Sequence, residues 1–199
     1  APDGSVPPVR DVIYVVTDPG VPAYGRQGCS VHVQSVLREL TTRATAAGGT
    51  VTLIPTRLGG EAPAGLDGVR TLELGRPGAG DPAEAEVALQ GLDARAADLV
   101  AEVLDTLSSS PEYRRGVDVP APLVYQRYGL WSAEVMERAG AQGARTVLEI
   151  NAPLVEEQER HRVLVDRTTA LEMTGSAVRA AHPVPYKHPR AHGTSLHLG

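Results

Sequence analysis

A loop with three glycines, residues 18–28, holds the first residues that could do chemistry. Gly20, Gly25 and Gly28 follow the apolar run Val12–Thr17 and precede an amphipathic segment. A glycine at the start of a helix lets a phosphate approach the backbone, where free N–H groups and the helix dipole favour an anion. The loop is therefore a candidate anion site, and glycines that only close turns are an equally good interpretation.

Two common nucleotide-binding motifs do not fit this loop. A dinucleotide fingerprint needs G-x-G-x-x-G, but the close first pair of glycines is missing and the next apolar run ends in "IPTR" without an acid for the ribose. A P-loop needs G-x-x-x-x-G-K-[ST], but Arg26 and Gln27 occupy the lysine and hydroxyl positions. We therefore expect neither a nicotinamide or flavin cofactor nor P-loop chemistry.

The cysteine and the histidines of the C-terminal tail give no recognisable site. Cys29 is the single cysteine, so it forms no internal disulfide and is expected to be a small apolar filler in a reducing compartment. The tail histidines are spaced by six, four and five residues on a proline-rich segment, and they are His182, His188, His192 and His197. These spacings fit no common metal-ligand pattern, so no metal site is expected.

Alternating apolar runs and amphipathic segments must position these residues. The continuous apolar run 12–17 predicts a strand buried on both faces. Further strands are predicted over residues 50–56, 69–74, 123–128 and 145–150. Helical periodicity predicts a helix from the glycine loop to Gly48, one from the cap Asp81 to about Leu107, one over 131–143 and a long one over 151–181. This alternation predicts an α/β fold, a Rossmann-like parallel sheet with helices on both faces.

The carboxyl ends of the predicted strands are the expected place for a site. Ligands of open parallel sheets bind outside this edge, and three stretches reach it: the glycine loop, "QRYGLW" and "EINAP". On the helix that follows, Glu156 with Arg160 and Glu157 with His161 are spaced as i,i+4 pairs.

Composition narrows the class of protein. The 199 residues are 42% hydrophobic and 22% charged, as in a soluble globular protein with one domain. A net charge of -5 gives no electrostatic basis for binding nucleic acid. No apolar run is long enough to span a bilayer, so a cytoplasmic chain is expected. We expect a flexible leader over 1–10, one domain over 11–181 and an irregular His/Pro-rich tail over 182–199.

Segments of this chain, in their order, resemble the N-terminal half of family 4 glycosyltransferases, which are GT-B enzymes with two Rossmann-like domains. The resemblance spans about residues 10 to 180 and is carried by "GVPAYGRQGCSVHVQSVLREL", "YQRYGLW" and "LEINAPLVEEQ". The last two resemble a bacterial subgroup. The resemblance implies retaining transfer from a nucleotide-activated sugar, which is a substrate, with no cofactor or divalent metal.

The resemblance also implies roles for individual residues. The loop that reaches the diphosphate of the donor corresponds to Gly25, Gly28, Ser30 and His32, and the acceptor side corresponds to Arg127, Tyr128, Trp131, Glu149 and Asn151. Structural alternatives are a packing histidine for His32, a surface ion pair for Arg127 and a core position for Trp131. Asn151 stands where the family sometimes has a histidine, so no catalytic residue is assigned.

The donor-binding half of such an enzyme, with its E-x7-E type motif, is not in this sequence. We therefore expect an acceptor-binding half that is inactive without a C-terminal domain or partner chain, and whose acceptor is a sugar or glycoconjugate. A standalone, non-catalytic binding module with the same fold is the alternative. An acceptor on a membrane surface and a homodimer formed through an exposed apolar edge are both compatible with the sequence.

Overall fold

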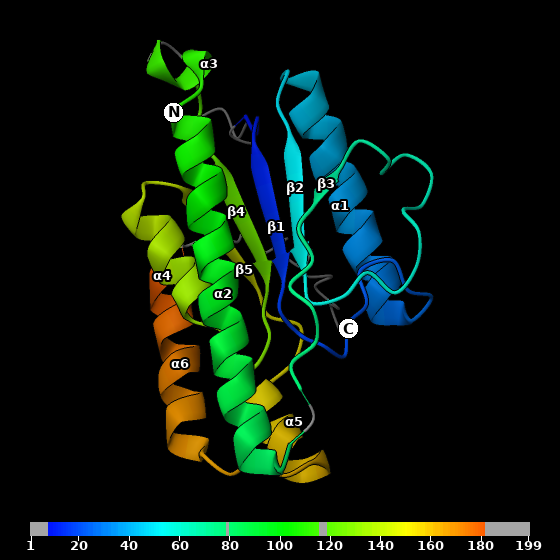
Figure 1. Ribbon diagram of the computed structural model, residues 1–199, viewed down its shortest axis with the longest axis vertical. Helices are drawn as coiled ribbons and strands as arrows, with labels where there is room; N and C mark the ends of the chain where they lie inside the picture. Colours follow the sequence, from blue (N-terminus) through cyan, green and yellow to red (C-terminus); the bar gives the residue numbers. More distant parts are fainter. Residues whose placement is uncertain (1–7, 79, 116–118, 182–199) are drawn as a thin grey trace, which may run out of the picture.

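The computed structural model describes residues 8–78, 80–115 and 119–181, and its centre is a five-stranded parallel sheet (Figure 1). The strand order is β3-β2-β1-β4-β5. The strands are β1 (Val12–Val16), β2 (Val51–Pro55), β3 (Arg70–Thr71), β4 (Leu123–Arg127) and β5 (Arg145–Glu149). The α/β fold expected from the sequence, with a Rossmann-like parallel sheet, is confirmed.

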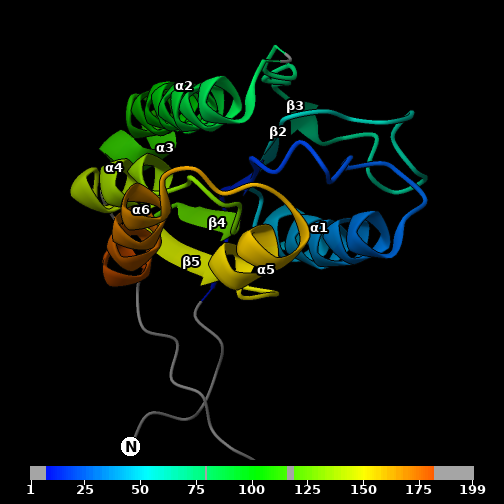
Figure 2. The same cartoon turned by 90° about the horizontal axis from the view of Figure 1, so that it is seen from below.

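Helices cover both faces of this sheet. Figure 2 shows α1 (Gly28–Ala46) on one face, and α2 (Pro82–Ser108), α4 (Glu134–Ala141) and α6 (Arg167–Ala180) on the other. Side chains alternate along each strand, so β1 supplies Tyr14 to the core under α1 and Ile13 to the core under α2 and α4. All five residues of β1 are buried, as expected for the central strand of a sheet covered on both faces.

The register of the parallel strands brings their carboxyl ends to one level. Val16 at the end of β1 lies opposite Pro55 of β2 and Arg127 of β4. Arg127 lies opposite Glu149, the last residue of β5. Polar residues that leave adjacent strands therefore meet at this edge, where the short helix α5 (Leu154–His161) also lies (Figure 1).

The prediction of one long helix over 151–181 is wrong, because α5 and α6 are separate helices. Arg162, directly after α5, has extended backbone with φ −144° and ψ −170°. A short helix that the sequence did not predict, α3 (Pro111–Arg114), follows α2. The apolar run 69–74 pairs as a strand only over β3, although Leu72 and Leu74 still donate backbone hydrogen bonds to β2.

A buried carboxylate on another helix holds the turn between α5 and α6. Glu86 of α2 accepts hydrogen bonds from the backbone N–H groups of Val165 (2.7 Å) and Asp166 (3.0 Å). Asp166 then caps α6 by accepting the N–H of Thr169 at 2.9 Å. These two amides bond to Glu86 instead of to helical carbonyls, so the chain turns between the two helices.

The structure describes the last three residues of the expected leader over 1–10. Val9 packs against the core under α1, and Arg145 donates a hydrogen bond to the carbonyl oxygen of Pro8 at 2.7 Å. Residues 1–7 of the expected leader, and the expected tail with its four histidines, lie outside the described residues. Among the described helices, none has the length and apolar character needed to cross a membrane.

Candidate functional site at the carboxyl edge of the sheet

The glycine loop between β1 and α1 is held by backbone hydrogen bonds to the chain that follows β2. Ala23 N–H donates to the carbonyl of Arg57 (3.0 Å), and Tyr24 N–H donates to that of Leu58 (2.7 Å). Gln34, the seventh residue of α1, donates its side-chain amide to the carbonyl of Gly25 at 2.8 Å. The loop is thus fixed at its centre and at its junction with the helix.

The surroundings of Gly25 and Gly28, the two glycines assigned to the donor side, give different reasons for a glycine at each position. A Cβ on Gly25 would lie 2.6 Å from Cγ of Pro22 and 2.8 Å from Oγ of Ser30, so close packing excludes a side chain there. A Cβ on Gly28, the first residue of α1, would meet nothing within 4 Å. Gly28 therefore leaves open the approach to the first turn of the helix, where N–H groups have no helical partner. Ser30 is fully buried, and its hydroxyl has no hydrogen-bond partner among the described residues.

The carboxylate of Glu149 is the centre of a polar group that we call the Glu149 cluster. One oxygen, Oε1, lies 2.7 Å from Nε2 of His32, 3.1 Å from the Arg127 guanidinium and 2.5 Å from the Asn151 amide nitrogen. The other oxygen, Oε2, accepts the hydroxyl proton of Tyr125 at 2.8 Å. Four side chains from α1, β4 and the end of β5 are thus held by one carboxylate.

The surroundings of Glu149 keep its carboxyl group ionised. Its side chain is 13% exposed. Burial alone raises the pKa of this carboxyl, but hydrogen bonds from Asn151 and Tyr125 and the proximity of His32 outweigh it, so the pKa lies below its usual range. The group is ionised at neutral pH, and both oxygens have donors. It therefore holds the Arg127 guanidinium and the His32 ring in place.

Strand alternation separates the acceptor-side residues that the sequence grouped together. Tyr125 and Arg127 lie on the α1 face of β4 and join the Glu149 cluster. Tyr128 turns to the opposite face, is buried, and its hydroxyl lies 2.5 Å from the hydroxyl oxygen of Thr174 on α6. The sequence motifs did not single out Tyr125, although its place two residues before Arg127 puts it on the same face.

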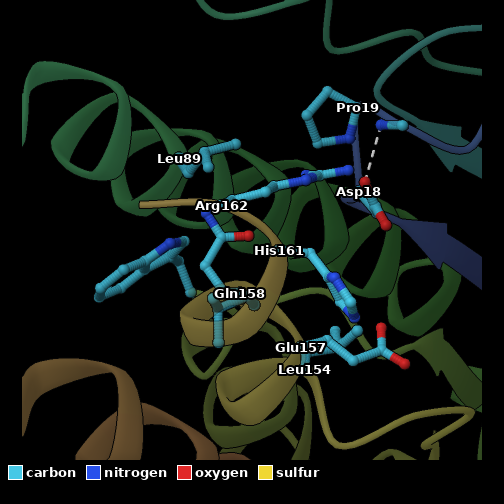
Figure 3. Close-up of a pocket in the computed structure, with 11 residues that line it drawn as sticks. Asp18, Pro19, Leu89, Leu154, Glu157, Gln158, His161 and Arg162 are labelled. Carbon is cyan, nitrogen blue, oxygen red and sulfur yellow. Dashed lines mark hydrogen bonds between the residues drawn. The ribbon is translucent and has the colours of Figure 1, made fainter. Parts of the chain in front are cut away.

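A crevice of about 370 Å³ lies on the other side of β4 (Figure 3). It is bounded by the loop after β1, the loop after β4, α2 and α5. Its lining residues are Asp18, Pro19, Gly20, Leu89, Leu130, Trp131, Leu154, Glu157, Gln158, His161 and Arg162. From β1 the chain passes to α1 on one face, and from β4 to α4 on the other face. The crevice thus lies at the topological switch point, where open α/β sheets bind their ligands.

Trp131 forms part of a wall of this crevice and is 1% exposed. It packs with Val155 of α5 and Ala170 of α6, so it is a core residue rather than an exposed stacking platform. Its φ of +73° is the single positive value at a non-glycine residue of the described chain. Such a conformation in a bulky residue costs about 1–3 kcal/mol and persists only where the surroundings impose it.

Two buried contacts hold the Trp131 loop in place. Asp93 of α2 accepts the N–H groups of Ala133 (2.7 Å) and Glu134 (2.8 Å). The hydroxyl oxygens of Thr17 and Ser132 lie 2.7 Å apart and join the loop after β4 to the end of β1. Burial raises the pKa of Asp93 to about 6, although the two N–H groups oppose this shift. The walls of the crevice are therefore fixed relative to one another.

The charged side chains of the crevice were not among the predicted site residues. Of these, Asp18 could have been found by the carboxyl-edge rule, because it lies two residues after the end of β1. The helix residues Glu157, His161 and Arg162 gave no such signal, because their placement depends on the break between α5 and α6. The i,i+4 pair expected between Glu157 and His161 does not occur among the ion pairs of the described residues.

The described residues contain no group of three or more His, Cys, Asp or Glu side chains arranged to hold a metal ion. Comparison of the chain with protein-family models, with curated proteins and with solved structures found no match.

Proposed function

We propose that this chain is the acceptor-binding half of a retaining glycosyltransferase that uses a nucleotide sugar as donor. One observation carries the proposal. The Glu149 carboxylate gathers His32, Arg127 and Asn151 at the edge of the sheet where α1 begins. The resemblance to family 4 glycosyltransferases implies that the same residues, from three separate motifs, face one cleft, and this supports the proposal.

The chemistry that this arrangement supports is stabilisation of a leaving diphosphate. The diphosphate gains negative charge as its bond to the sugar breaks, and fixed N–H donors stabilise that charge. The first turn of α1, open at Gly28, supplies backbone donors. Arg127 supplies a guanidinium held by Glu149. His32, whose side chain is 48% exposed, contacts the same carboxylate oxygen through Nε2. A C-terminal domain or partner chain would bind the nucleotide and the donor sugar.

The test is whether diphosphates bind at Gly28. Backbone amide signals of the isotope-labelled chain are followed by NMR while UDP, GDP, ADP or inorganic pyrophosphate is added at millimolar concentration. We expect shifts confined to residues 28–32 and Arg127. The variant Gly28→Ala should lose them, because its methyl group occupies the approach to the helix while leaving the fold unchanged.

The matched control is Gly91→Ala on α2, where an added Cβ also meets nothing within 4 Å. This variant should keep the shifts and gain about 0.5–1 kcal/mol in stability, because alanine favours a helix interior. If no diphosphate shifts residues 28–32 in the unmodified chain, the proposal is wrong and a non-catalytic binding module becomes the better description.

A further inference from the structure

We propose that the crevice at the switch point binds a neutral polyhydroxylated ring, a monosaccharide or a cyclitol. The role of this ring as the acceptor rests on the proposed function. Its chemical class follows from the residues that line the crevice, which no part of the glycosyltransferase resemblance assigned apart from Trp131.

Four chargeable side chains converge on the crevice without pairing with one another. Asp18 and Glu157 supply carboxylates, Arg162 supplies a guanidinium and His161 an imidazole. None of the four takes part in an ion pair of the described residues. The Arg162 side chain extends from the end of α5 toward the loop of Asp18 and Pro19 (Figure 3).

This combination of acceptors and donors suits hydroxyl groups best. Each hydroxyl donates one hydrogen bond and accepts others, so neighbouring hydroxyls of a ring can donate to a carboxylate and accept from a guanidinium. Asp18 uses Oδ1 to accept the N–H of Gly20 at 2.7 Å (Figure 3), which fixes the direction of its carboxylate. Gln158 of α5 adds an amide whose nitrogen donates to the carbonyl of Val163 at 3.1 Å, leaving its oxygen as an acceptor.

Charged ligands fit this crevice less well. A phosphate has only acceptor oxygens and would meet the carboxylates of Asp18 and Glu157. With two carboxylates and one guanidinium, the lining has no surplus of positive charge that would favour an anion. An amine could pair with a carboxylate, but it has no acceptor for the guanidinium of Arg162. A hydroxyl group can satisfy both kinds of partner.

The remaining lining and the size of the crevice agree with a single ring. Leu89, Leu130, Trp131 and Leu154 form apolar walls that can cover the C–H faces of a ring. A volume of about 370 Å³ lies at the lower end of the range for pockets that enclose small organic ligands. The walls are held by the contacts of Asp93 and of Thr17 with Ser132, so little ordering is needed on binding.

The test uses the full chain of 199 residues, with neutral rings and charged analogues as probes. Methyl α-glucopyranoside, methyl α-mannopyranoside and myo-inositol are titrated against the isotope-labelled protein, with glucose 6-phosphate and glucosamine as charged analogues. We expect at least one neutral ring to shift the indole N–H of Trp131 and the amides of Asp18, Gly20 and residues 157–162. It should bind more tightly than its charged analogue.

Variants assign the binding to the crevice. Asp18→Asn keeps the acceptor for Gly20, and Arg162→Gln keeps an amide donor, so both should fold as the parent does; each is expected to weaken binding about tenfold. Arg160→Gln, on α5 but outside the lining, is the matched control and should bind unchanged. Unfolding midpoints equal to that of the parent protein would show that a loss of binding is local.

The outcomes separate this inference from the proposed function. Binding of a neutral ring at the crevice without diphosphate shifts at residues 28–32 supports the inference and overturns the transferase proposal. Diphosphate shifts without binding of any neutral ring, or tighter binding of the phosphorylated or amino analogue, overturn the inference. Ring binding that is insensitive to Asp18→Asn and Arg162→Gln overturns it as well.

Discussion

At the scale of single residues, Glu149 shows how one buried carboxylate can organise a site without reacting in it. Both of its oxygens accept hydrogen bonds, from partners that include Tyr125 and Asn151. Removing the charge of Glu149 would leave the Arg127 guanidinium without its anionic partner. The Arg127 side chain is 13% exposed, and an unpaired charge in such a site is costly. The carboxylate therefore contributes to stability as well as to the placement of Arg127 and His32.

We predict that Glu149→Gln lowers the free energy of unfolding at neutral pH by about 1–3 kcal/mol. The folded pKa of Glu149 lies below its unfolded value, so its contribution is present above the unfolded pKa and is lost as pH falls through the folded pKa. The difference between the parent protein and the variant should therefore shrink below about pH 4.5. Urea unfolding at neutral and acidic pH measures this difference.

The control for this prediction is Glu61→Gln, which removes an exposed carboxylate from the loop after β2. It should change stability by less than about 0.5 kcal/mol at either pH. A pH-independent loss in Glu149→Gln would contradict the charge-holding role and point to packing alone.

At the scale of elements, the sequence predicts the strands whose signals lie within their own residues. The four longer strands appear within a residue or two of the predicted positions, as Val12–Val16 does for the apolar run 12–17. The carboxyl-edge rule brings Arg127 and Glu149 together because β4 and β5 pair in register. The break after α5 could not be predicted in this way, because it depends on Glu86, about 80 residues earlier in the chain.

We predict that Glu86→Ala destabilises the junction between α5 and α6. The N–H groups of Val165 and Asp166 would lose their acceptor, which costs about 1–3 kcal/mol for buried groups. Hydrogen exchange should accelerate at these two amides and at Thr169 more than in the strands. Glu102→Ala, an exposed position on α2, is the control, and equal acceleration in both variants would contradict the assignment.

At the scale of the whole molecule, the two candidate sites lie on opposite sides of β4 at one edge of the sheet. The Glu149 cluster faces α1 and the crevice faces α2 and α5, because successive residues of β4 point to opposite faces. The crevice depends on the loop that leaves β4, and Asp93 holds that loop from within the core. The ionisation of Asp93 therefore affects both the stability of the fold and the loop that forms the crevice wall.

Asp93 carries the pH dependence that we expect for the molecule as a whole. Its pKa rises from 3.8 to about 6 on folding, so between these values the folded state binds more protons than the unfolded state. Its contribution to stability thus falls as pH rises from about 4 to about 6, by up to about 3 kcal/mol, since one pKa unit equals about 1.4 kcal/mol.

We predict that Asp93→Asn removes this dependence. The asparagine oxygen can accept the N–H groups of Ala133 and Glu134 as the carboxylate does, but it carries no charge to desolvate. Relative to the parent protein, the variant should gain stability steadily as pH rises from about 4 to about 7, whatever its offset at acidic pH. Urea unfolding across this range measures the slope. If the two proteins instead change in parallel with pH, Asp93 is not the titrating group, and the N–H groups of α4 stabilise its carboxylate enough to cancel the cost of burial.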